Sequence, residues 1–154
     1  MAIPMSMTHK ELRSELANTQ LHIGELYHEK KDYKTAASWF KASAGNRNAA
    51  AYRSYANMLY DGQGVEKDAK AAVMWYNESA TLGNAVAMFQ LAWIYLNDRK
   101  STCETTDLSR KYGTILMNSS AERGCSRAIN YLKTMTPNVT SSKKHTMTLR
   151  SQAK

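Results

Sequence analysis

The sequence predicts an all-α fold, a solenoid of about three helical hairpins followed by a terminal capping helix. The first observation is an internal repeat, because residues 32–51 and 68–87 share one pattern at a constant offset of 36 residues. A fixed period of roughly 20–50 residues is typical of repeat arrays. The second observation is that both prolines, Pro4 and Pro137, lie outside the repeated region, so nothing there interrupts a helix. Stacked hairpins would bury apolar faces that one hairpin cannot bury alone.

The N-terminal helix is predicted from about His9 to Glu29. Thr8 and Glu11 have the spacing of a capping box, in which each side chain bonds the other residue's backbone N–H. Apolar residues at helical spacing predict one inward face, formed by Leu12, Leu16, Ile23 and Leu26. The helix is longer than a repeat needs, so we interpret residues 1–16 as an N-terminal segment and cap helix.

Residues 17–135 are predicted to form the repeat domain, with units at about 17–48, 49–84 and 85–125 and a cap at 126–135. Short polar residues that suit N-caps precede the helices, namely Asp32, Asn48, Asp68 and Asn84. The residues expected to face inward in the first two units are Ala36, Trp39, Phe40, Ser43, Ala51, Tyr55, Ala56 and Leu59. Gly62 and Gly64 predict a turn with positive φ angles.

The third copy is degenerate. Leu116 takes the place of Trp75 at an offset of 41 residues, so an insertion is expected in an irregular loop over residues 98–106. Ser126 can cap the last helix, to about Met135. Residues 136–154 are polar, basic and without an apolar period, which predicts a disordered tail.

The net charge of +8 is unevenly distributed. Through Glu122 there are 14 Lys or Arg against 13 Asp or Glu, whereas seven Lys or Arg and no acid follow. The high isoelectric point therefore reflects the tail rather than a basic face. Nucleic acid is not an expected partner, because residues 136–154 also lack aromatic side chains for stacking.

Residues 51–87 resemble the Sel-one-like repeat (SLR), a relative of the tetratricopeptide repeat. The motif residues that carry the resemblance are Gly62, Gly64, Val65, Asp68, Ala72, Trp75, Tyr76, Ala80, Gly83 and Ala87. The first copy of this repeat has a loop that is four residues shorter, and the third copy lacks the Gly-x-Gly-Val turn. The resemblance spans about residues 17–135 and implies an α/α right-handed superhelical solenoid that binds another protein.

In such arrays the first helix of each hairpin lines a concave groove. Carried over through the family register, the partner-binding positions are Leu21, Glu25, His28, Arg53, Asn57, Tyr60, Phe89, Trp93 and Leu96, continued by Asn130. Phe89 and Trp93 are four residues apart and share a helix face. They are either a binding hot spot or core covered by the terminal helix. Arg53 could hold a carboxylate of the partner or pair with Glu25.

No constellation of residues predicts catalysis, and no cofactor or metal is expected. Ser38 and Lys41 have a Ser-x-x-Lys spacing without its companion motifs. The four histidines show no metal-ligand spacing with each other or with Cys103 and Cys125. A hydrolase is the alternative that this pattern disfavours.

The expected function is therefore non-enzymatic binding of a protein. The partner is either a toxin or effector, neutralised by an immunity or inhibitor protein, or a subunit of a signalling or secretion complex assembled by an adaptor. We expect no small-molecule substrate and no membrane segment, since no run of about 18 apolar residues occurs. Two cysteines and no apolar signal segment lead us to expect a cytoplasmic protein.

Overall fold

The computed structural model describes residues 7–97 and 107–135, and every regular element in these ranges is an α-helix. The seven helices are α1 (His9–Glu29), α2 (Tyr33–Gly45), α3 (Ala49–Asp61), α4 (Ala69–Thr81), α5 (Ala85–Asn97), α6 (Asp107–Glu122) and α7 (Ser126–Met135). The all-α prediction is thereby confirmed, as are the predicted ends of the first helix. The loop predicted over residues 98–106 and the tail predicted over 136–154 lie outside the described residues.

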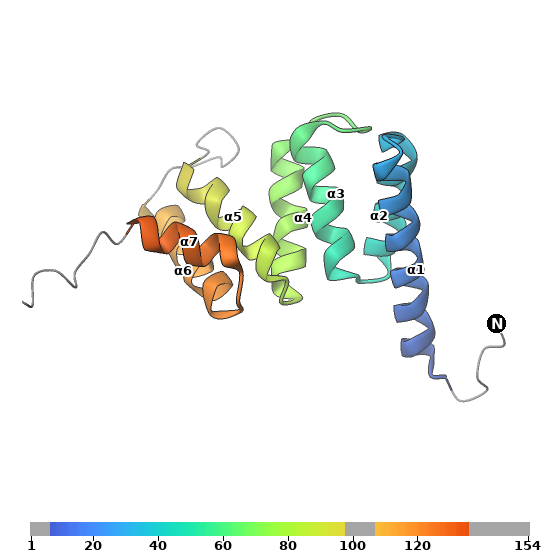
Figure 1. Ribbon diagram of the computed structural model, residues 1–154, viewed down its shortest axis with the longest axis horizontal. Helices are drawn as coiled ribbons and strands as arrows, with labels where there is room; N and C mark the ends of the chain where they lie inside the picture. The colour runs from blue at the N-terminus through green and yellow to red at the C-terminus, as the bar shows by residue number, and fades with distance from the viewer. Residues whose placement is uncertain (1–6, 98–106, 136–154) are drawn as a thin grey trace, which may run out of the picture.

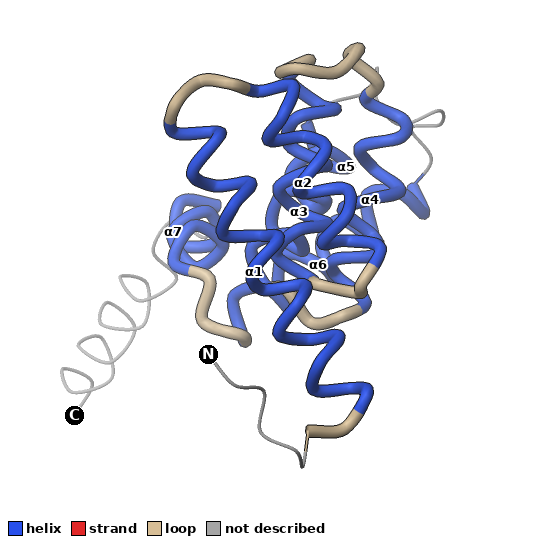
Figure 2. Tube along the Cα trace, turned by 90° about the vertical axis from the view of Figure 1, so that its right-hand side faces the viewer, coloured by secondary structure: helices blue, strands red, loops and turns tan. Residues whose placement is uncertain are grey.

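The helices form a row of hairpins along the long axis of the molecule (Figure 1). The pairs α1–α2, α3–α4 and α5–α6 follow one another, and α7 closes the row on α6. Each helix packs mainly against its neighbours in the sequence, and the tube in Figure 2 contains only helices and their connections. This is the solenoid arrangement that the repeat predicts.

The helix starts follow from the predicted N-caps. The Thr8 hydroxyl accepts from the Glu11 N–H, and the Glu11 carboxylate accepts from the Thr8 N–H, which completes the capping box. Asp32, Asn48 and Asp68 each accept a bond from the N–H three residues further on. These bonds satisfy donors that the first helical turn leaves without partners.

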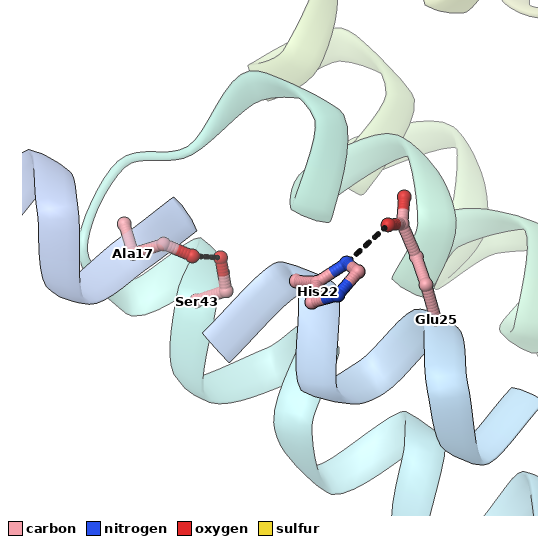
Figure 3. Close-up of polar contacts among 4 residues, drawn as sticks. All are labelled: Ala17, His22, Glu25 and Ser43. Carbon is pink, nitrogen blue, oxygen red and sulfur yellow. Dashed lines mark hydrogen bonds and ion pairs between the residues drawn. The ribbon is translucent and has the colours of Figure 1, made fainter. Parts of the chain in front are cut away.

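In each of the three hairpins one buried serine joins the two helices through the same kind of hydrogen bond. The hydroxyls of Ser43, Ser79 and Ser120 donate to the carbonyls of Ala17, Ala49 and Ala85, each at 2.6 Å. Figure 3 shows the first of these bonds, between α2 and α1. All three serines are fully buried. The repeated hydrogen bond from a serine of the second helix to an alanine of the first thus fixes the axial position of the two helices relative to each other, as well as their close contact.

Helix α1 differs from its prediction. Leu12, Leu16 and Leu26 are exposed instead of forming an inward face, and Ala17 and Gly24 are the buried residues. A Cβ built on Gly24 would lie 2.7 Å from the ring of Phe40, so the contact with α2 depends on small residues. The apolar period correctly predicts a helix here. The face of that helix that contacts α2, however, carries the small residues Ala17 and Gly24 rather than the leucines.

The core runs through the array as one cluster, from α2 to the start of α7. Phe40, Tyr55, Tyr76, Leu91 and Met117 are among its buried residues. The inward residues predicted for the first two units are buried except Trp39, which is partly buried.

Candidate protein-binding groove

The residues predicted for the groove come from three helices that are first in their hairpins. Helices α1, α3 and α5 each supply side chains at intervals of four and three residues, which places them on one helix face. Glu25, His28 and Trp93 are exposed, whereas Arg53, Asn57, Tyr60 and Phe89 are partly buried.

The structure brings most of these residues together in three adjoining cavities. A cavity of about 310 Å³ lies between α1 and α3 and is lined by Glu25, His28, Glu29, Phe40, Ser54, Asn57 and Met58. Asn57 also lines a second cavity of about 340 Å³ between α3 and α5. We call the surface formed by these cavities, and by the third that adjoins them at α7, the groove.

The second cavity is the aromatic part of the groove. Tyr60, Phe89 and Trp93 line it, together with Asn57, Asp61, Tyr76, Gln90, Ile94 and Arg127. Trp93 is 42% exposed although it is a large apolar side chain. Phe89 is partly buried and packs against the core, and Arg127 of α7 lines the same cavity as both aromatic residues.

The third cavity, of about 340 Å³, lies where α3 and α5 face the start of α7. It is lined by Arg53, Val86 and residues 124–127. Arg127 belongs to this cavity and to the aromatic one, so the two cavities are neighbours.

Three predicted positions lie elsewhere. Leu21 and Leu96 pack against the core and line none of these three cavities. Leu96 faces α6, since its Cγ would lie 3.1 Å from a Cβ built on Gly113. Asn130 is exposed on α7 and lines none of the three cavities either.

Several residues that line the groove were not predicted as partner-binding positions, among them Glu29, Asp61, Gln90 and Arg127. Gln90 follows Phe89 on α5 and lines the aromatic cavity. Arg127 lies on the terminal helix α7, three residues before the expected position, Asn130. The repeat register predicts the helix face on which a side chain lies. It predicts neither how far that side chain extends nor which residues of a terminal helix line the groove.

A buried hydrogen-bond network supports the floor of the aromatic cavity. The Asn57 Oδ1 accepts from the Tyr76 hydroxyl at 2.6 Å and from the Gln90 Nε2 at 2.9 Å. Burial, then the charge of Asp61, raises the pKa of Tyr76 far above its ordinary value, so its hydroxyl stays protonated and donates. In the described part of the chain the Oε1 of Gln90 is buried and has no hydrogen-bond partner.

The two ends of the groove carry opposite charge. Glu25 and Glu29 lie at the α1 end, and Arg53 and Arg127 at the α7 end. Glu25 contacts His22 at 3.7 Å, as Figure 3 shows, rather than Arg53. Among residues 7–97 and 107–135, neither Arg53 nor Arg127 forms an ion pair.

Other kinds of site were sought in the same ranges. No group of three or more His, Cys, Asp or Glu in the described residues could hold a metal ion. None of the described helices has the length and apolar character needed to cross a membrane. The Ser38 hydroxyl donates to the Lys34 carbonyl at 3.2 Å on an exposed face of α2.

Fold and groove together define a helical-hairpin repeat solenoid with a row of neighbouring cavities lined by α1, α3, α5 and α7. The family model of the Sel1 repeat matches residues 16–46, 49–84 and 85–102, which is more than half of the sequence. The chain therefore belongs to the Sel1 repeat family, whose members generally act as protein–protein interaction modules.

Two solved structures resemble this fold. A Sel1 repeat protein from Oxalobacter formigenes is 23% identical with a TM-score of 0.66, over 79% of this chain and 49% of its own. The protein c5321, a protective antigen of uropathogenic Escherichia coli strains with an SLR fold, is 21% identical with a TM-score of 0.52. That match covers 79% of this chain and 33% of c5321. The chain thus spans about half of one and a third of the other. No curated protein sequence matches the chain.

Proposed function

We propose that this chain binds a partner protein in the groove and catalyses no reaction. The observation that carries the proposal is the aromatic cavity, in which Phe89 and the exposed Trp93 line a hollow between two helices. Exposed tryptophan in a concave site, bordered by arginine, is the composition typical of binding hot spots. Contact with a partner would remove the apolar surface of Trp93 from water, which is favourable.

The rest of the groove supports binding rather than chemistry. Its titratable groups come from all three cavities, namely Glu25, His28, Glu29, Arg53, Tyr60, Asp61, Tyr76, Cys125 and Arg127. Burial raises the pKa of Tyr76, so its hydroxyl stays neutral and serves in the hydrogen-bond network. The Ser38 hydroxyl is bonded to its own helix and faces away from any of the three cavities.

The proposal is tested by affinity capture with three immobilised forms of the full chain: the unaltered protein, Trp93→Ala and Met74→Ala. Met74 is the matched control, because it is an exposed apolar side chain on α4 that lines none of the three cavities. We expect a protein from the native cell to be retained by the unaltered chain and by Met74→Ala. Trp93→Ala should retain about tenfold less, which corresponds to roughly 1.4 kcal/mol of binding free energy.

Two results would count against the proposal. Equal retention by all three forms would place the interface outside the groove. Retention of no protein by the unaltered chain, together with turnover of a small molecule, would favour an enzyme such as a hydrolase.

Two forms of protein binding fit this proposal and differ in the occupant of the groove. An immunity or inhibitor protein would retain a single toxin or effector in one-to-one stoichiometry and abolish its activity. An adaptor would retain a subunit of a signalling or secretion complex, and the remaining subunits would follow through that subunit. Stoichiometry of the captured material, followed by an activity assay of the captured protein, separates the two.

A further inference from the structure

We propose that the groove selects a dipolar segment of its partner, in which one large apolar side chain lies between a basic residue and an acidic residue. The inference rests on the proposed function and specifies the chemistry of the partner. The basic residue of the partner lies towards α1, the apolar side chain enters the aromatic cavity, and the acidic residue lies towards α7.

The α1 end of the groove is suited to a cation. Glu25 and Glu29 are four residues apart, so both carboxylates leave the same face of the helix. They share the cavity with His28 and Phe40, and no Lys or Arg lines it. A lysine or arginine of the partner would find two carboxylates here without a competing cation of the cavity.

The α7 end is suited to an anion. Arg53 of α3 and Arg127 of α7 both line this cavity, and no Asp or Glu lines it. The cavity also borders the start of α7, where the helix dipole places partial positive charge. Guanidinium groups bind carboxylates through two parallel hydrogen bonds, so a glutamate or aspartate of the partner is the fitting group.

The cavity between these ends is suited to an apolar anchor. Tyr60, Phe89 and Trp93 give it an aromatic lining that favours a large apolar side chain, and its volume of about 340 Å³ has room for one. Asp61 and Arg127 are its charged residues, one of each sign.

The order of charges excludes partners of one sign. A polyanion, such as a nucleic acid or an acidic peptide, would be repelled at Glu25 and Glu29. A polybasic segment would be repelled at Arg53 and Arg127. Like charges brought together at an interface are strongly disfavoured, so the two ends act together as a filter.

The test is selection from a library of random peptides long enough to reach from α1 to α7, with the full chain as bait. We expect the unaltered chain to enrich peptides that carry Phe, Trp, Leu or Met between a Lys or Arg and an Asp or Glu. The double variant Arg53→Glu with Arg127→Glu should enrich basic residues on both sides of the anchor. The double variant Glu25→Lys with Glu29→Lys should enrich acidic residues on both sides.

Matched charge reversals on the exposed face of α4, Lys70→Glu and Glu78→Lys, serve as controls and should leave the enriched pattern unchanged. The dipolar peptide from the first selection should lose about tenfold in affinity for either groove variant, the scale of one charge-assisted hydrogen bond. Thermal melting of each variant establishes that it is folded before selection.

The failures of the two proposals are distinguishable. Peptides that bind in a Trp93-dependent manner without the charge order, or that stay the same in the reversal variants, would overturn the dipolar inference and leave groove binding intact. No enrichment, or enrichment that Trp93→Ala does not reduce, would overturn groove binding and the inference with it.

Discussion

Two tryptophans in neighbouring hairpins have opposite surroundings. Trp75 of α4 is partly buried and contacts the rings of Tyr52 and Tyr55 at centroid distances of 5.5 and 4.7 Å. Trp93 of α5 is 42% exposed in the groove. The same side chain therefore holds one hairpin together and remains accessible in the next.

The positions equivalent to these tryptophans show the same division. The third hairpin has Leu116 where the second has Trp75, and this leucine is buried. The second hairpin has Asn57 where the third has Trp93, and the Asn57 carbonyl is engaged by Tyr76 and Gln90. The comparison teaches that interior positions keep an apolar residue of some kind in each repeat, while groove positions vary freely in chemistry.

The largest expected effect tests this division directly. Trp75→Ala should lower the free energy of unfolding by about 3–5 kcal/mol, because a packed indole is lost and a cavity remains. Trp93→Ala should lower it by less than about 1 kcal/mol, as for an exposed side chain. Urea denaturation of both variants measures the difference, and similar losses would show that Trp93 is part of the core.

The turn before α4 provides a second pair. Gly62 and Gly64 have φ angles of 76° and 69°, where an alanine costs roughly 1–2 kcal/mol. A Cβ on Gly64 would also lie 2.3 Å from the Tyr33 carbonyl carbon, whereas one on Gly62 would approach only the Lys67 Cβ at 3.1 Å. We therefore expect Gly64→Ala to destabilise the fold clearly more than Gly62→Ala. Equal midpoints in thermal melting would mean that the turn shifts away from α2 without cost.

The serine hydrogen bonds are the same in all three hairpins, so the effect of removing each one can be compared directly. Ser43→Ala, Ser79→Ala and Ser120→Ala should each cost about 1–3 kcal/mol, since each leaves a buried carbonyl without its donor. Ser38→Ala is the matched control on an exposed face and should change stability by less than about 0.5 kcal/mol. A hairpin that tolerated the change would be held by its side-chain packing alone.

The sequence predicts the architecture well, because the repeat records helix boundaries several times over. Asp32, Asn48 and Asp68 act through bonds to residues three positions away, which a sequence displays directly.

The groove is less accessible to sequence reasoning, for physical reasons. Gln90 is linked to it by a hydrogen bond to a residue 33 positions earlier, and Arg127 lines it from the terminal helix, outside the three repeat units. Leu96 has the right helix face but is drawn towards α6 by the absence of a side chain at Gly113. Contacts that depend on several helices at once leave no period in the chain.

The smallest expected effect falls on the part of α1 that has no counterpart in the other hairpins. The residue equivalent to Ala17 is Ala49, the first of α3, so the first two turns of α1 precede the repeat.

Bonds from the Thr8 backbone N–H and hydroxyl lower the pKa of Glu11 below its ordinary value of 4.5. The capping box therefore stabilises these turns above that pH, and the contribution is lost as the pH falls through the lowered pKa. Hydrogen exchange should show the Leu12 amide, bonded to the Thr8 carbonyl at 3.0 Å, losing protection in acid while amides of α3 keep theirs. Glu11→Gln should remove most of that pH dependence, and an unchanged acid response in this variant would assign it to another group.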